Sequence, residues 1–197
     1  MAIIEVRGLK KKFGEVSAVD GVDLAIPEGE LLVILGPSGC GKTTLMRLIA
    51  GLEQPTEGQV SIAGQDVTDR PPRVRGVAMV FQSYALYPHM TVFNNIAFPL
   101  KAQSSFSKAE IQDKVLMAAG VLGIEKLLDQ KPRQLSGGER QRVALCRAMV
   151  KEPSVLLLDE PLSNLDAKLR ASARDELQRF QRRLGITTIF VTHDQIE

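Results

Sequence analysis

The stretch GPSGCGKTT, residues 36–44, decides the fold of this chain, because it fits the phosphate-loop pattern G-x-x-x-x-G-K-[ST]. An apolar run from Leu31 to Leu35 leads into it and predicts a buried strand. Residues Leu45 to Ala50 follow with helical character, and Gly51 ends the predicted helix. Strand, loop and helix in this order predict an α/β fold with a site for a nucleoside triphosphate.

The residue types of this loop suit phosphate oxygens. Glycines let backbone N–H groups curl around an anion without Cβ clashes, and the following helix points its positive end at the same anion. We expect Lys42 to reach the β- and γ-phosphates and the Thr43 hydroxyl to ligate Mg²⁺. The predicted nucleotide-binding residues of the loop are Gly36, Pro37, Ser38, Gly39, Cys40, Gly41, Lys42, Thr43 and Thr44.

The composition is that of an ordinary globular protein, with 44% hydrophobic and 24% charged residues in a chain of 197. A formal net charge of +2 gives no reason to expect a nucleic-acid partner. No apolar run approaches the ~20 residues of a transmembrane helix, and no secretory signal opens the chain. We therefore expect any membrane role to come through a partner protein.

Apolar and polar side chains alternate from Ile3 to Ile26, with a turn after Phe13. This pattern predicts an antiparallel hairpin with one covered face. Phe13 ends the first strand beside the turn. Its ring could stack on a nucleobase, a contact worth about 1–3 kcal/mol, or pack in the core, and its position favours neither.

A glutamine and an aromatic segment follow the next predicted buried strand, Val77 to Phe81. Gln82 stands at the carboxyl end of that strand, where α/β sheets place their ligands, so it could coordinate Mg²⁺, orient a water or simply end the strand. The segment from Tyr84 to Met90 is too apolar for a solvated loop and too irregular for a core element. We interpret it as a docking surface.

A helical region is predicted next, over about residues 84–150. Thr91 can cap one helix, and Ser107 with Glu110 forms a capping box for another. The segment LSGGERQR, residues 135–142, then opens a third helix, Val143 to Val150.

The start of that third helix has features of an anion site. Ser136 alone would be explained as an ordinary helix cap. Gly137 and Gly138 weaken the helix start unless something must approach closely, so we expect a second anion-binding helix N-terminus.

Two acids end the apolar strand that runs from Val155 to Leu158. Carboxylates are unfavourable there unless a cation meets them, and the Mg²⁺ of the phosphate loop would supply one. We expect Asp159 to hold the metal and Glu160 to act as general base, which is worth roughly 10²–10⁴-fold in rate. The alternative is an acid pair at a helix N-terminus.

A long helix from Ala167 to Leu184 and a strand from Ile186 to Thr192 complete the chain, with His193 at the carboxyl end of that strand. His193 could hydrogen-bond a γ-phosphate, although a structural histidine would satisfy the same position.

Taken together, GPSGCGKTT, the Gln82 loop, LSGGERQR, VLLLDEP, SNLD and VTHD resemble, in this order, the ATP-binding subunit of an ABC transporter over essentially the whole chain. The stretches MVFQSYALYPHMTV and DEPLSNLDAKLR are similar to the subfamily that powers prokaryotic uptake of oligosaccharides and of solutes such as glycerol phosphate. The resemblance implies one ATP-binding domain over 1–197, a P-loop NTPase core with a mostly parallel sheet, an N-terminal antiparallel β-subdomain and a helical subdomain. It also implies a peripheral location at the cytoplasmic face of the membrane.

The resemblance also implies roles and partners. Phe13 would stack on adenine, Gln82 would sense Mg²⁺ and the γ-phosphate, and His193 would contact the γ-phosphate. Two subunits would close head to tail around ATP. The residues implied at that interface are Ser136, Gly137, Gly138 and Asp166. A membrane permease would dock near Tyr84–Met90, and an external solute-binding protein would act through the permease.

Two departures from the family pattern matter. Glu139 stands where the family usually has Gln, and a negative charge near a triphosphate is unfavourable unless it points away or faces cations. The chain also stops at Glu197, where family members usually continue, so it looks truncated. We expect it to be less stable and a poorer ATPase than a complete subunit.

Two other functions compete with transport. The first is an ABC ATPase acting in translation or DNA repair, which usually carries paired cassettes or long coiled coils, whereas this chain has one cassette and no sustained heptads. The second, an adenylate-type phosphotransferase, gives LSGGERQR no task.

Overall fold

The computed structural model describes residues 2–103, 105–165 and 167–194. The chain divides into two compact units. The first unit comprises Met1–Met79, Ser154–Glu160 and Asp175–Glu197, and it carries the phosphate loop. The second unit comprises Val80–Pro153 and Pro161–Arg174, and it carries the LSGGERQR segment.

An antiparallel sheet opens the first unit. Its strands are β1 (Ala2–Phe13), β2 (Val16–Pro27), β4 (Glu57–Ile62) and β5 (Gln65–Asp66), in the order β2-β1-β4-β5. The predicted N-terminal hairpin and its turn are confirmed. The sheet is wider than that hairpin, because β4 pairs with β1 from the other side, and local alternation of side chains carries no signal for such a distant pairing.

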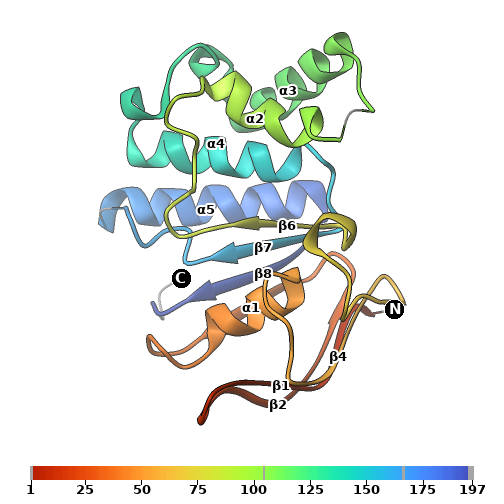
Figure 1. Cartoon of the computed structure of the whole chain (residues 1–197). Helices are drawn as coiled ribbons and strands as arrows, with labels where there is room; N and C mark the ends of the chain where they lie inside the picture. The colour runs from red at the N-terminus through yellow and green to blue at the C-terminus, as the bar shows by residue number, and fades with distance from the viewer. Residues whose placement is uncertain (1, 104, 166, 195–197) are drawn as a thin grey trace. The chain divides into compact units, whose positions relative to one another are not determined.

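A second sheet positions the candidate site. Its strands are β3 (Leu31–Leu35), β8 (Thr187–Thr192), β7 (Val155–Asp159) and β6 (Val77–Val80), in the order β3-β8-β7-β6 (Figure 1). Strand β8 pairs in parallel with both β3 and β7. The predicted α/β fold with a mostly parallel sheet is therefore confirmed.

The burial of these strands differs from the prediction at two places. Every residue of β7 and β8 is buried, as continuous apolar runs indicate. The prediction that β3 is buried was wrong, because β3 is the edge strand, and Val33 and Leu35 are 44% and 49% exposed. Strand β6 is also less buried than predicted and ends at Val80, before Phe81.

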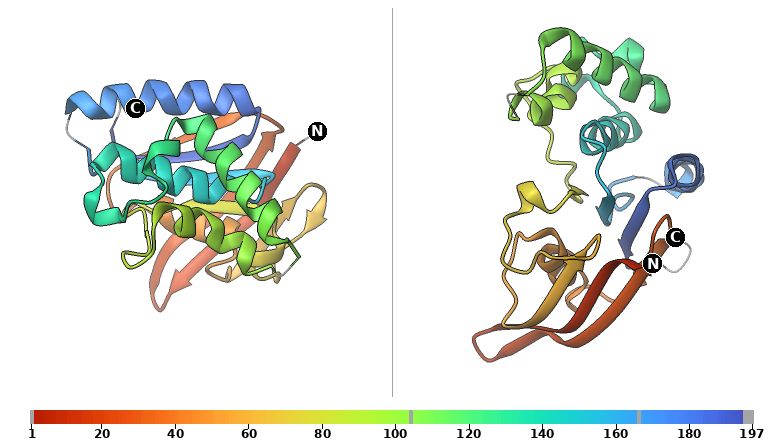
Figure 2. Two further views of the ribbon diagram at one scale, coloured as in Figure 1. Left: turned by 90° about the horizontal axis from the view of Figure 1, so that it is seen from above. Right: turned by 90° about the vertical axis from the view of Figure 1, so that its right-hand side faces the viewer.

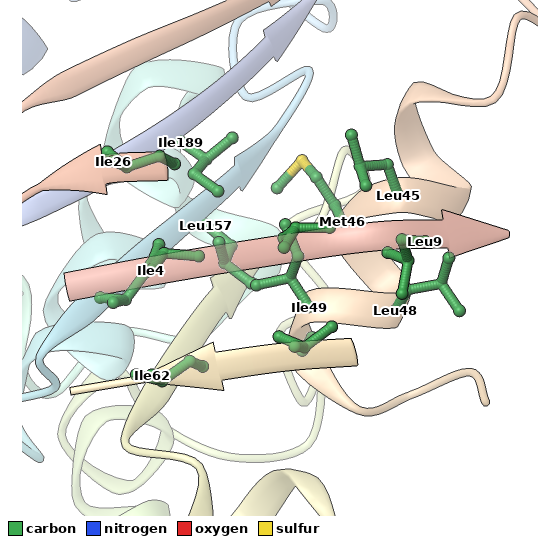
Figure 3. Packing of buried hydrophobic residues seen from close by; sticks show 14 of the residues in the cluster. Ile4, Leu9, Ile26, Leu45, Met46, Leu48, Ile49, Ile62, Leu157 and Ile189 are labelled. Atoms are coloured by element: carbon green, nitrogen blue, oxygen red, sulfur yellow. The ribbon is translucent and has the colours of Figure 1, made fainter. Parts of the chain in front are cut away.

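Helix α1 (Lys42–Ala50) lies between the two sheets of the first unit (Figure 1). Figure 3 shows Met46 and Ile49 of α1 among side chains from both sheets, such as Ile4 of β1 and Leu157 of β7, and all four belong to one buried hydrophobic cluster. This packing fixes the helix that follows the phosphate loop.

The far end of α1 is held by a buried arginine. Arg75 is 3% exposed, and its Nη1 donates to the carbonyls of Leu48 at 2.9 Å and Ile49 at 3.1 Å. A cation is favourable at this end, where the helix carbonyls point. Gly51 ends the helix with φ 77°, as predicted. The short helix η1 (Pro72–Val74) precedes Arg75.

Helix α5 (Ala167–Leu184) covers the opposite face of the parallel sheet with its second half, as the views in Figures 1 and 2 agree. Gln181 is 5% exposed, and its Nε2 donates to the carbonyls of Gly29 at 2.9 Å and Ile186 at 3.0 Å. The predicted helix and its end at Gly185, φ 61°, are confirmed.

The second unit is built on helices α2 (Val92–Lys101), α3 (Lys108–Leu122) and α4 (Gly137–Met149), which pack on one another (Figure 1). Two short helices, η2 (Glu125–Leu127) and η3 (Pro132–Gln134), connect α3 to α4.

The helix starts of this unit follow the predicted caps. The Thr91 cap and the Ser107–Glu110 capping box are confirmed. Helix α4 begins at Gly137 rather than at Val143, because Ser136 already caps it there.

Candidate functional site

The phosphate loop of the first unit runs from β3 into α1, and residues 37–40 are exposed to solvent. Gly41 is the N-cap of α1, and the first turn of the helix contains no acidic residue. Free N–H groups at such a helix start attract an anion. The loop therefore has the geometry of a phosphate site.

Two glycines of the loop are required for different reasons. Gly41 has φ 93°, and a Cβ there would overlap the carbonyl oxygen of Ala18 in β2. Gly39 has φ 83°, but among the described residues no atom lies within 4 Å of the position that a Cβ would take there. Gly41 thus combines a left-handed backbone with a close approach to the hairpin that carries Phe13.

Lys42 lies beneath this loop rather than in solvent. It is 7% exposed, and its Nζ donates to the carbonyls of Gly36 at 2.7 Å and Pro37 at 2.8 Å. These hydrogen bonds compensate the burial of an ammonium group. The charge is held beside the backbone that would surround a phosphate.

A hydroxyl and a carboxylate meet below the loop. Thr43 Oγ1 donates to Asp159 Oδ1 at 3.0 Å, and Asp159 is 7% exposed. Burial raises the pKa of the Asp159 carboxyl, and the Thr43 hydrogen bond opposes that rise. The described residues contain no cluster of three or more His, Cys, Asp or Glu that could hold a metal. Two adjacent oxygen donors suit Mg²⁺, which keeps several waters and binds substrate phosphates.

Asp159→Asn is expected to raise the melting temperature of the metal-free protein at neutral pH. The pKa of the Asp159 carboxyl is higher in the folded than in the unfolded protein. The stability that this carboxyl contributes is therefore fully present below its unfolded pKa, and it is lost as the pH rises through its folded pKa. We expect the gain at neutral pH to shrink toward about pH 3, where the carboxyl becomes protonated in both the folded and the unfolded state. Thermal unfolding from about pH 3 to pH 8 tests this. An equal gain at every pH would contradict it.

A second pair stands at the same edge of the parallel sheet. His193 Nδ1 lies 3.1 Å from Glu160 Oε2, and the two residues follow β8 and β7, which are neighbours. Glu160 has φ 47°, a backbone conformation that non-glycine residues rarely adopt, and its N–H donates to the Val191 carbonyl at 3.0 Å. The phosphate loop follows β3, the other neighbour of β8, so the parallel strands bring these groups to one edge.

Phe13 is not a core residue. Its side chain is 47% exposed, which excludes the core-packing alternative. Lys11 Nζ lies 4.8 Å from the ring centroid and pairs with Glu53 at 2.8 Å. Phe13 pairs with Val16 of β2, close in sequence to the Ala18 that touches the phosphate loop. Its ring is available for stacking, and the adenine role stays a prediction.

The start of α4 is occupied by its own side chain. Glu139 Oε2 accepts from the Ser136 N–H and from the Ser136 hydroxyl, each at 2.7 Å, and these hydrogen bonds hold the pKa of Glu139 below its usual value. The Glu139 carboxylate therefore turns toward the helix start, and does not point away from it.

The two glycines after Ser136 differ. A Cβ on Gly137 would lie 2.9 Å from Leu165 Cδ2, so internal packing already explains this glycine. At Gly138 a Cβ would meet no described atom within 4 Å, so Gly138 leaves open space at the helix start. Packing within the described residues therefore gives no reason for a glycine at 138, and the anion-binding role of this helix start stays a prediction.

The family follows from comparison with known proteins. The family model for the ABC transporter matches residues 19–163, which span the phosphate loop, LSGGERQR and the acid pair. The chain belongs to the ABC transporter family. In a solved structure, a dimeric ATP-binding cassette in a post-hydrolysis state bound to ADP and phosphate, the fold is shared with TM-score 0.83 and 34% identity, covering 97% of this chain and 88% of the other.

Several curated relatives of this ABC protein are import ATP-binding proteins. The trehalose/maltose import ATP-binding protein of Thermococcus litoralis is 56% identical over all of this chain and 54% of its own length. An sn-glycerol-3-phosphate import ATP-binding protein of Rhizobium johnstonii is 58% identical over all of this chain and 53% of its own length. The chain thus spans about half the length of these relatives.

The remaining predicted residues of this ABC protein belong to the second unit or are not described. Gln82 is exposed, and its carbonyl accepts from Asn164 Nδ2 at 2.5 Å. Gln82 and Ser136 lie in the second unit, so their roles toward a nucleotide stay predictions. Asp166 lies outside the described residues. In the part of the chain that the structure describes, none of the helices has the length and apolar character to cross a bilayer.

Sequence reasoning missed the buried side chains of Arg75 and Asn95 and the partly buried side chain of Arg147. Asn95 is 0% exposed, and its position inside an apolar helix was a signal that it bonds to backbone. The two arginines gave no such signal, because arginine is common on exposed helix faces and their carbonyl partners are distant in sequence.

Proposed function

We propose that this chain is the ATP-binding and hydrolysing part of a subunit that energises an ABC importer for carbohydrates or related solutes. One observation carries the proposal. The Thr43–Asp159 pair, the Glu160–His193 pair and the phosphate loop all lie at the carboxyl ends of the parallel strands β3, β7 and β8. The names of the relatives support import of sugars or glycerol phosphate.

The proposed reaction is ATP + H₂O → ADP + phosphate. The loop amides and Lys42 bind the triphosphate, and Glu160 accepts a proton from the water whose oxygen attacks the γ-phosphorus. The bond from that phosphorus to the β,γ-bridging oxygen then breaks. The Thr43 hydroxyl and Asp159 would hold Mg²⁺, which would supply positive charge to neutralise the phosphates. His193 holds the Glu160 carboxylate through their 3.1 Å contact and reaches the γ-phosphate.

The proposed assembly is a head-to-tail dimer that encloses ATP. Phe13 stacks on adenine, while Ser136 and Gly138 of one copy approach the ATP held by Lys42 of the other, with Gly137 and Asp166 at the interface. The dimeric solved relative supports this arrangement. The permease docks at Tyr84–Met90, the external solute-binding protein acts through it, and the assembly sits at the cytoplasmic face of the membrane.

Purification of the tagged full-length protein from gently solubilised membranes tests the proposal. We expect a multi-spanning permease to co-purify and the complex to hydrolyse ATP faster with the solute-binding protein loaded. Recovery of ribosomal or DNA-repair proteins without a permease would instead support the non-transport ABC ATPase.

Glu139→Gln is expected to lower the KM for ATP by about three- to tenfold in the assembled transporter. A neutral amide competes less well than a carboxylate for the Ser136 hydroxyl, since charge-assisted hydrogen bonds are stronger by about 1 kcal/mol. Glu110→Gln is the matched control, because Glu110 forms the same capping box with Ser107 on α3. Steady-state hydrolysis over a range of MgATP concentrations is the measurement. Equal KM shifts in both variants would contradict the role of Glu139.

A further inference from the structure

The segment that follows Gln82 contains two consecutive residues in an unfavourable backbone conformation. Tyr84 has φ 60° and Ala85 has φ 47°, both in the left-handed region that favours glycine. Tyr84 is 4% exposed and therefore anchors the segment. Two adjacent non-glycine residues keep such a conformation only where neighbouring groups impose it.

Arg147 of α4 imposes this conformation. Its Nη2 donates to the Tyr84 carbonyl and its Nη1 to the Ala85 carbonyl, each at 2.7 Å. The guanidinium carbon also lies 5.6 Å from the centroid of the Tyr87 ring. One planar fork thus holds both strained residues and one aromatic ring, a set of contacts that a lysine ammonium cannot reproduce.

A fully buried side chain, that of Asn95, holds the rest of the segment. The Asn95 Oδ1 accepts from the Tyr87 N–H at 2.8 Å, and its Nδ2 donates to the carbonyls of Tyr87 at 3.1 Å and Thr91 at 3.0 Å. The Tyr87 ring packs on Phe98, with 4.7 Å between centroids. Arg147 at the start and Asn95 further along therefore define the shape of the whole segment.

The surface held in this way is exposed. Ala85, Pro88 and His89 are exposed to solvent, and Phe98 beside them is 39% exposed. The segment is thus a preformed surface on the second unit, and its shape depends on the arginine of the same helix that Ser136 caps.

We propose that Arg147 is a positioning residue that holds Tyr84–Met90 in the shape that a permease helix recognises. The inference rests on the proposed function, which places the permease at this segment. It adds that docking depends on the two carbonyl contacts of Arg147, and that α4 links the docking surface to the LSGGERQR helix start.

The test is the affinity of the full-length protein for its purified, detergent-solubilised permease. We expect Arg147→Met to weaken binding at least tenfold and Arg147→Lys to weaken it to a lesser degree. Adding Ala85→Gly to Arg147→Met should restore most of the affinity, because glycine adopts a positive φ without strain. Lys114→Met is the control, since it removes a cation of the same unit that pairs with Glu152, and it should bind like the unchanged protein.

The outcomes separate the two proposals. An unchanged protein that does not bind the permease overturns the proposed function. Binding by Arg147→Met that equals the unchanged protein overturns the role of Arg147. A loss of binding that Ala85→Gly does not restore, together with a lower melting temperature, makes Arg147 a residue of general stability and also overturns the inference.

Discussion

Glu160→Gln is expected to lower ATP turnover by roughly 10²–10⁴-fold and to leave ATP binding intact. The amide has the size of the carboxylate but cannot accept the proton of the attacking water. The Glu160 side chain is 16% exposed and lies 3.1 Å from His193 Nδ1, so the replacement keeps a hydrogen-bonding partner for the imidazole. Because ATP then persists, the closed dimer should accumulate.

Glu152→Gln is the matched control for this experiment. Glu152 is also a glutamate with a positive φ, 52°, and its carboxylate pairs with Lys114 at 2.7 Å. Both residues lie far from the phosphate loop in the sequence. Phosphate release by the full-length protein, ATP retention and sedimentation of the dimer are the measurements. Near-normal turnover of Glu160→Gln would remove Glu160 from the role of general base.

The pattern of the sequence was most informative where local chemistry decides the structure. A continuous apolar run such as β7 and a glycine-rich phosphate loop are each compatible with few local structures. The buried strand β7, the phosphate loop and the helix α1 that follows the loop were therefore predicted correctly. The capping box of Ser107 and Glu110 is likewise a local device, and it formed as predicted. These features depend on residues a few positions apart.

Distant pairings were beyond the same reasoning. An apolar run such as β3 is equally consistent with a central or an edge strand, and the order of the sheet, with β3 outermost, decides its exposure. The contact between Glu160 and His193 depends on β7 lying beside β8. These two strands are separated in the sequence by the whole of α5. Arg147 reaches carbonyls that lie far from it in the chain.

Gly41→Ala is expected to destabilise the protein by about 2–5 kcal/mol, while Gly39→Ala is expected to cost about 1–2 kcal/mol. Both substitutions place a Cβ on a left-handed residue, which accounts for the smaller figure. At Gly41 the Cβ also overlaps the Ala18 carbonyl, and relieving such overpacking costs about 1–3 kcal/mol more. Urea unfolding of both variants without nucleotide or metal is the measurement.

An equal loss in the two variants would mean that the contact between the phosphate loop and β2 is not rigid. A larger loss at Gly41 would mean that this glycine does two things: it turns the backbone into α1, and it lets the hairpin of Phe13 lie against the loop. ATP binding should then fall in parallel, because moving the hairpin away would displace the exposed Phe13 ring that we propose to stack on adenine. The stacking role proposed for Phe13 thus depends on a glycine whose usual explanation is the phosphate alone.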